Sequence, residues 1–131
     1  MVKPEGKDAL YERALTWLKA KQPAKRELVF THGDANPGNF LVRDEAISGV
    51  VDWEFAGLSD DPFSEIAHFV WLHDGQLAKP LAQEFSEVLK RDIKETKWYF
   101  VRAWLGITYL GTDPASELFQ LRRDVLAQLT A

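Results

Sequence analysis

The segment VFTHGDANPGNFLV, residues 29–42, restricts what this chain can fold into more than any other stretch of its sequence. An apolar run leads into His32, Gly33 and Asp34, and a second apolar run begins only after two asparagines, a proline and a glycine. Because these residues favour turns, the two apolar runs cannot belong to one continuous strand or helix. The pattern predicts two short strands separated by a loop that carries polar side chains.

A small hairpin is expected beside this loop. Residues 28–30 form a continuous apolar run, which is typical of a strand covered on both faces. Residues 40–43 and 47–53 have the pattern of two strands joined by a tight polar turn, and residues 56–61 that of a loop. A hairpin of this kind returns the chain to the side of the sheet from which it started.

Helical periodicity accounts for most of the remaining chain. We expect helices over 8–20, 62–74, 77–94, 97–110 and a final segment that Asp113 and Pro114 open. The helix over 97–110 is so apolar that it should be central. The first helix should bury Leu10, Ala14, Trp17 and Leu18, and the last should bury Leu118, Leu121, Val125 and Leu129. The expected fold class is therefore α+β, mostly helical, with a small β-hairpin.

Length and composition exclude several classes of protein. The 131 residues suit one domain with a single core. The chain has no cysteine, which excludes disulfides and thiolate metal sites, and its net charge of −4 gives no reason to expect nucleic-acid or acidic-membrane binding. No apolar run approaches the length of a membrane span, and the first residues do not resemble a signal peptide. We therefore expect a cytoplasmic protein.

Three oxygen-bearing side chains are expected to meet beside the loop. Asp34 and Asn39 lie on the loop itself, and Asp52 ends the returning strand of the hairpin. Carboxylate and amide oxygens are the ligands that Mg²⁺ prefers, with water and phosphate completing its shell. Asp34 suits the role of a base that orients a hydroxyl and accepts its proton in phosphoryl transfer. Asn39 and Asp52 would then hold the metal.

The neighbours of Asp34 have expected supporting roles. Gly33 and Gly38 allow the backbone to turn sharply around the carboxylate. His32 should support the loop through hydrogen bonds rather than perform acid–base chemistry. Taken singly, the polar residues of the loop are ordinary turn formers. Their combination between a strand and a hairpin favours catalytic ancestry.

Other candidate sites are weaker. His32, His68 and His73 could form the metal cluster of a hydrolase, but the last two are five positions apart in the expected helix and would not lie side by side. Four aromatic residues could form a cation-binding box, although their helical spacing favours a place in the core: Trp98, Tyr99, Trp104 and Tyr109. Four acidic residues could meet a cationic aminoglycoside, although solvated helix faces are favoured: Glu84, Glu87, Glu95 and Glu117.

The sequence HGD at residues 32–34, with Asn39 and the following GVVDWEFAGLSDDPFSEIAHF, resembles the catalytic core of the aminoglycoside phosphotransferase and choline kinase family. These enzymes are similar to protein kinases, whose H-R-D-x-x-x-x-N loop and D-F-G aspartate occur in the same order. The resemblance covers residues 28–72. It implies that Asp34 is the catalytic base and that Asn39 and Asp52 are ligands of Mg²⁺, which acts with ATP.

The resemblance also implies a structural role for Asp61, which opens the next helix and would steady the catalytic loop. Glu65 departs from the family pattern, which often has aspartate there. The fold implied is the C-terminal lobe of a protein-kinase-like enzyme. Its expected divisions are a leading helix and polar tail over 1–27, the catalytic loop and hairpin over 28–60, and a helical subdomain over 61–131.

Family members carry an N-terminal lobe that covers the nucleotide phosphates. Only about 27 residues precede the first expected strand here, and they contain no G-x-G-x-x-G sequence, so that lobe is expected to be absent. The expected function is the C-terminal lobe of an ATP-dependent small-molecule kinase, weak or inactive alone. The alternative is a non-catalytic binding or structural module. Expected partners are a hydroxyl-bearing small molecule and either a second copy or a separate N-terminal lobe, without nucleic acid or membrane.

Overall fold

The computed structural model describes residues 8–24, 28–59 and 61–131. Helices in these segments are α1 (Ala9–Ala20), α2 (Phe63–Val70), α3 (Lys79–Leu89), α4 (Thr96–Leu110) and α5 (Glu117–Leu129), with short 3₁₀ turns η1 (Pro37–Asn39) and η2 (Ile93–Glu95). Strands are β1 (Val29–Thr31), β2 (Phe40–Arg43), β3 (Ala46–Val50) and β4 (Gly57–Ser59). The predicted α+β class, mostly helical, is confirmed. Parts of the expected leading segment, residues 1–7 and 25–27, lie outside the described residues.

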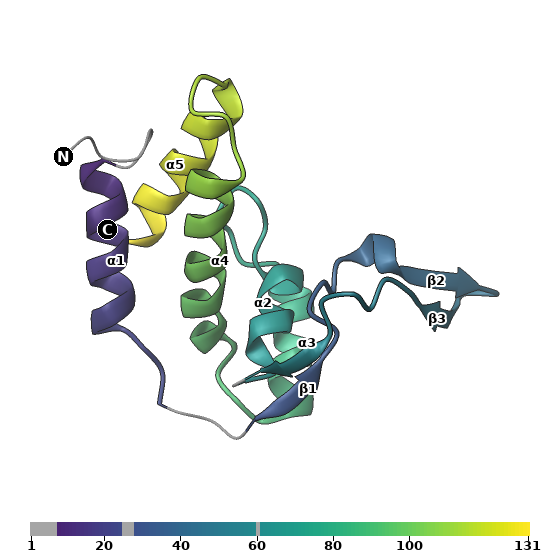
Figure 1. Ribbon diagram of the computed structural model, residues 1–131. Coiled ribbons are helices and arrows are strands. Elements are labelled where there is room, and N and C mark those ends of the chain that lie inside the picture. The colour runs from purple at the N-terminus through teal and green to yellow at the C-terminus, as the bar shows by residue number, and fades with distance from the viewer. Residues whose placement is uncertain (1–7, 25–27, 60) are drawn as a thin grey trace.

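Helix α4 is the centre of the helical body, as predicted (Figure 1). It contacts α1, α2 and α5, and Tyr99, Phe100, Trp104 and Tyr109 are buried along it. Phe100 and Trp104 stack with ring centroids 5.1 Å apart. The aromatic residues of this helix therefore form core, apart from Trp98, which is only partly buried. A helix buried on so many sides needs the apolar composition that its sequence shows.

The first helix docks on α4 through both of its ends. The Asp8 carboxylate caps α1 by accepting the Leu10 amide at 3.1 Å, and it also accepts the Tyr109 hydroxyl at 3.0 Å and pairs with Arg123. Near the other end, the Trp98 indole donates to the Leu18 carbonyl at 2.8 Å. Because these contacts join residues about 80 to 115 positions apart, they fix the helix on the body.

The buried face of α5 differs from the predicted one. Leu118 and Leu121 are 48% and 61% exposed, whereas Phe119 and Leu126 are buried together with the correctly predicted Leu129. Both sets of residues keep helical spacing. The face that carries Phe119 is the buried one, because this ring packs edge-on against Tyr109 with 5.5 Å between the ring centroids.

Two of the predicted helices are shorter than expected. The helix predicted over 62–74 ends at Val70, because Trp71 turns into an extended conformation and its indole donates to Thr96 at 2.9 Å. His73 therefore lies in the loop after α2 and not in a helix. The segment 77–94 divides into α3 and η2 at Lys90, whose backbone is left-handed with a φ of 53°.

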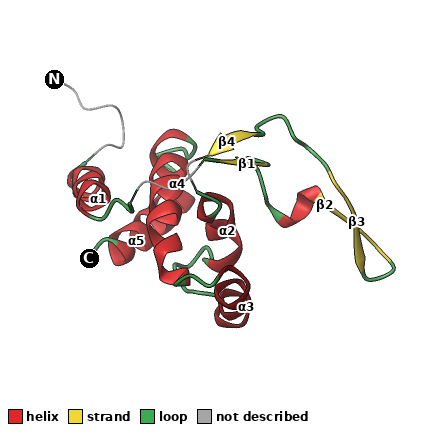
Figure 2. Cartoon of the chain, turned by 90° about the horizontal axis from the view of Figure 1, so that it is seen from below, coloured by secondary structure: helices red, strands yellow, loops and turns green. Residues whose placement is uncertain are grey.

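The strands form two separate antiparallel pairs (Figure 2). The predicted hairpin is confirmed as β2 and β3, which pair from Phe40 with Val50 to Arg43 with Ala46. The second strand ends at Val50 and not at residue 53 as predicted, so Asp52 lies just beyond it. Strand β1 pairs with β4, which lies in a segment predicted to be a loop. This pairing satisfies the backbone groups of β1. The expectation that 28–30 is covered on both faces is wrong, since Leu28 and Phe30 are 56% and 67% exposed.

A buried ion pair fixes the start of α2. The Asp61 carboxylate is fully buried and accepts two hydrogen bonds from the Arg91 guanidinium, at 2.9 and 3.0 Å, and one from the Phe63 amide at 2.9 Å. Arg91 also pairs with Glu95 at 2.7 Å and lies over the Phe63 ring. Burial alone would raise the pKa of Asp61, but the hydrogen bonds from Arg91 and Phe63 outweigh it and leave the pKa below its usual value.

Replacing Arg91 with methionine should destabilise the fold by about 3 kcal/mol, because the Asp61 carboxylate would remain buried without its partner. Urea unfolding at neutral pH measures this change in the free energy of unfolding. The control is Arg43→Met at the exposed end of β2, which should change stability by less than about 0.5 kcal/mol.

Acid provides a second check on the same pair. Since the folded-state pKa of Asp61 is lower than 3.8, the pair contributes fully above that pH and is lost as pH falls through the folded-state value. The difference in stability between wild type and Arg91→Met should therefore narrow in acid. Equal stability of the two proteins at neutral pH would contradict the role given to this pair.

Candidate active site

Asp34 is oriented by amide groups of its own loop. Its Oδ1 accepts the Asn36 side-chain amide at 3.1 Å, and its Oδ2 accepts the Asn39 side-chain amide at 3.2 Å. Asn39 also donates to the Asp34 carbonyl at 2.8 Å. These contacts engage both carboxylate oxygens while leaving the side chain partly exposed. The loop therefore presents an oriented carboxylate to a space that solvent or a ligand can enter.

His32 links this loop to the end of β3. Its Nδ1 accepts the Asp34 amide at 3.2 Å, and its Nε2 lies 2.7 Å from the Val51 carbonyl. Since a carbonyl only accepts, the ring carries its proton on Nε2. The imidazole is buried and lies against Trp53, 4.6 Å between centroids. Both ring nitrogens are thus used to hold the backbone.

Gly33 has a backbone that a larger residue would not tolerate. Its φ is +88°, and a Cβ atom would lie 2.1 Å from the Phe55 carbonyl oxygen. Its amide donates to Glu65 Oε1 at 2.7 Å. Gly38 is not left-handed; instead its amide donates to the Asn36 side chain at 2.9 Å. The sharp turn around Asp34 depends on Gly33.

Asn39 directly precedes the first strand of the hairpin, and Asp52 follows its second strand. The Val51 amide donates to the Asn39 carbonyl at 2.9 Å, which joins the end of η1 to the residue before Asp52. Asp52 is exposed and has a left-handed backbone with a φ of 65°. Such a backbone is uncommon for a residue other than glycine, and it is frequent at functional sites.

The chemistry of these two side chains fits Mg²⁺. The side-chain nitrogen Nδ2 of Asn39 bonds to Asp34, so the side-chain oxygen Oδ1 of Asn39 can serve a cation, and the Asp52 carboxylate supplies an anionic oxygen. Mg²⁺ commonly binds through one or two protein oxygens and completes its shell with water and phosphate. Among the described residues, no three His, Cys, Asp or Glu side chains gather to hold a metal.

A cavity of about 620 Å³ adjoins Asp34. Its walls come from the catalytic loop, α2, the loop after α2 and α4, and they include His68, His73 and Arg102. Surrounding protein desolvates His68 and lowers its pKa, the charge of His73 lowers it further, and Asp34 opposes both. Asp34, His68 and His73 all line this one cavity.

The structure thus gathers most of the predicted site residues. Hydrogen bonds join Asp34 to His32 and to Asn39, and Gly33 bonds to Glu65. Asp52 follows Val51, whose amide binds the Asn39 carbonyl. Asp61 pairs with Arg91 at the start of α2, and Glu65 on α2 accepts a hydrogen bond from the Gly33 amide of the catalytic loop. Sequence reasoning did not assign that role to Glu65, although its departure from the family pattern marked the position.

A mostly helical α+β domain with a polar loop that orients Asp34 and Asn39 is an arrangement that a phosphotransferase can use. The sequence profile of the phosphotransferase enzyme family matches residues 1–104, about four-fifths of the chain. The chain belongs to this family. No solved structure matches it. Over the described residues, no helix has both the length and the apolar character that crossing a membrane requires.

Replacing Glu65 with alanine should free the Gly33 amide. Hydrogen bonds to a carboxylate contribute about 1.5–3 kcal/mol, so amide hydrogen exchange at Gly33 should become at least about tenfold faster. Glu65→Gln is the matched control, because its side-chain oxygen can still accept the amide hydrogen. Unchanged exchange in the alanine variant would contradict the role of Glu65 in holding the loop.

Proposed function

We propose that this chain is the C-terminal lobe of an ATP-dependent kinase that phosphorylates a hydroxyl group of a small molecule. The observation that carries the proposal is the oriented carboxylate of Asp34, held by Asn36 and Asn39 at the edge of the 620 Å³ cavity. Family membership supports the reaction class. Phosphoryl transfer depends mainly on positioning and charge stabilisation, which such a loop can provide.

Each residue of the loop has a distinct role in the proposed reaction. Asp34 orients the acceptor hydroxyl and accepts its proton while the hydroxyl oxygen bonds to the γ-phosphorus of ATP and the bond to the β-phosphate oxygen breaks. Asn39 and Asp52 would hold Mg²⁺, which when bound neutralises phosphate charge. His32 and Glu65 keep the backbone on either side of Asp34 in place.

Substitution of Asp34 and Asp52 should separate catalysis from binding. Asp34→Asn should retain binding of MgATP and lower phosphoryl transfer by about 10²–10⁴-fold, as loss of a general base does. Asp52→Asn should weaken binding of Mn²⁺, used as a paramagnetic probe in place of Mg²⁺, and of the metal–nucleotide complex. Calorimetry, Mn²⁺ spin-resonance titration and release of ADP are the measurements.

Asp124→Asn on the exposed side of α5 is the control, since it makes the same chemical change outside the family match. Two results would count against the proposal. One is absence of Mn²⁺ and nucleotide binding by the wild-type chain, and the other is equal metal affinity in the Asp52 and Asp124 variants.

A second candidate function has its own observation. An apolar groove of about 760 Å³ lies between the hairpin and helices α2 and α3, and Phe30, Val42, Ile47 and Trp53 line it while being at least half exposed. Exposed apolar surface of this kind marks interaction sites. Among the described residues, β2 and β3 pair only with each other, so the outer edge of each strand has no neighbour there. We propose a second copy of the chain as the occupant, in a non-catalytic module that self-associates.

Val42→Lys should abolish this self-association, because it places a charge in the groove. Sedimentation velocity over a range of protein concentrations measures the dimer. Val88→Lys on α3 is the matched control, since Val88 is 78% exposed and does not line the groove. A wild-type protein that stays monomeric throughout, or equal effects of the two variants, would exclude the second copy as occupant.

A further inference from the structure

The cavity beside Asp34 has an uneven distribution of charge. Among its described lining residues, the carboxylates are Asp34 and Glu65, and both are engaged by hydrogen bonds of the catalytic loop. The other lining side chains that can carry a charge near neutral pH are basic: His68, His73 and Arg102. The cavity is therefore acidic at the loop, where the reacting hydroxyl would lie, and basic along α4 and the loop that follows α2.

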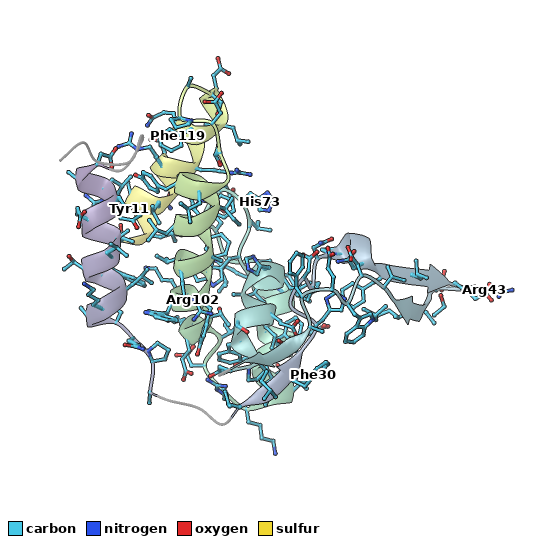
Figure 3. The ribbon with its side chains drawn as sticks, in the orientation of Figure 1. Tyr11, Phe30, Arg43, His73, Arg102 and Phe119 are labelled. Atoms are coloured by element: carbon cyan, nitrogen blue, oxygen red, sulfur yellow. The ribbon has the colours of Figure 1, made fainter. Side chains whose placement is uncertain are left out.

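Arg102 supplies the permanent charge of the basic wall. It is exposed on α4, and its guanidinium carbon lies 5.0 Å from the Trp98 ring centroid and 5.2 Å from that of Tyr99 (Figure 3). Both ring faces attract the guanidinium. Contact with the rings uses the face of the guanidinium and leaves the N–H donors at its edge. Their planar arrangement matches the two oxygens of a carboxylate or phosphate.

The histidines and aromatic residues complete a wall suited to a polar organic ligand. The lowered pKa of His68 makes its ring neutral near pH 7, so it can exchange hydrogen bonds with hydroxyl groups. Trp71, Phe100 and Ile107 provide apolar lining. A volume of about 620 Å³ lies within the usual range for small-molecule pockets.

We propose that the acceptor substrate of this site carries an anionic group, a carboxylate or a phosphate, that binds Arg102 while its hydroxyl lies at Asp34. This inference rests on the proposed phosphoryl transfer for the role of Asp34. A polycationic acceptor such as an aminoglycoside would place positive charge against Arg102, and the four acidic helix residues considered from the sequence do not line this cavity. The wall thus selects against cations as well as for anions.

The test uses three polyhydroxyl compounds of similar size and different charge: gluconate, glucose and glucosamine. Saturation-transfer NMR with the full chain, without nucleotide, measures binding of each. Gluconate should bind at least about tenfold more tightly than the other two, as expected for a charge-assisted hydrogen bond. Arg102→Gln should remove this preference and leave the weak binding of glucose unchanged, whereas Arg43→Gln at the hairpin end should leave all three unchanged.

The outcomes separate this proposal from the phosphotransferase assignment. A gluconate preference that depends on Arg102 supports an anion-binding wall, even if no phosphoryl transfer is found. Equal binding of the three compounds, no binding of gluconate, or a preference that survives Arg102→Gln overturns it. Transfer of phosphate from MgATP to glucosamine in preference to gluconate would also overturn it while leaving the proposed function intact.

Discussion

The hydrogen bond between the Gly33 amide and the Glu65 carboxylate is the contact on which the site depends. It joins the catalytic loop to α2, and α2 in turn packs on the central helix α4. The left-handed backbone of Gly33 and its approach to Phe55 make this position accessible only to glycine. Asp34 is thereby held relative to a cavity wall that α4 supplies, although the hairpin of β2 and β3 extends away from the helical body (Figures 1 and 2).

Local patterns in the sequence predicted much of this arrangement. The run of turn formers around Asp34, the apolar helix that became α4 and the hairpin of β2 and β3 are each specified by neighbouring residues, and each was predicted. The grouping of His32, Gly33, Asp34 and Asn39 was also accessible, because these residues share one short loop. The family resemblance supplied roles that spacing alone would not.

The differences arise where distant residues decide the outcome. Trp71 ends α2 by bonding to Thr96, and Phe119 displaces Leu118 and Leu121 from the buried face of α5 by packing on Tyr109. Strand β4 forms by pairing with β1. The composition of residues 57–59 alone does not indicate a strand. Periodicity cannot choose between competing faces or partners without knowledge of the tertiary contacts.

The hairpin has a mechanical consequence that follows from where it begins and ends. Strand β2 starts directly after Asn39, and β3 ends two residues before Asp52, so both proposed metal ligands lie at the base of the hairpin. A molecule that binds in the groove and twists the hairpin would change the distance between the side-chain oxygens of Asn39 and Asp52. Binding of a molecule in the groove and binding of the cation would then be coupled, so that each changes the affinity for the other.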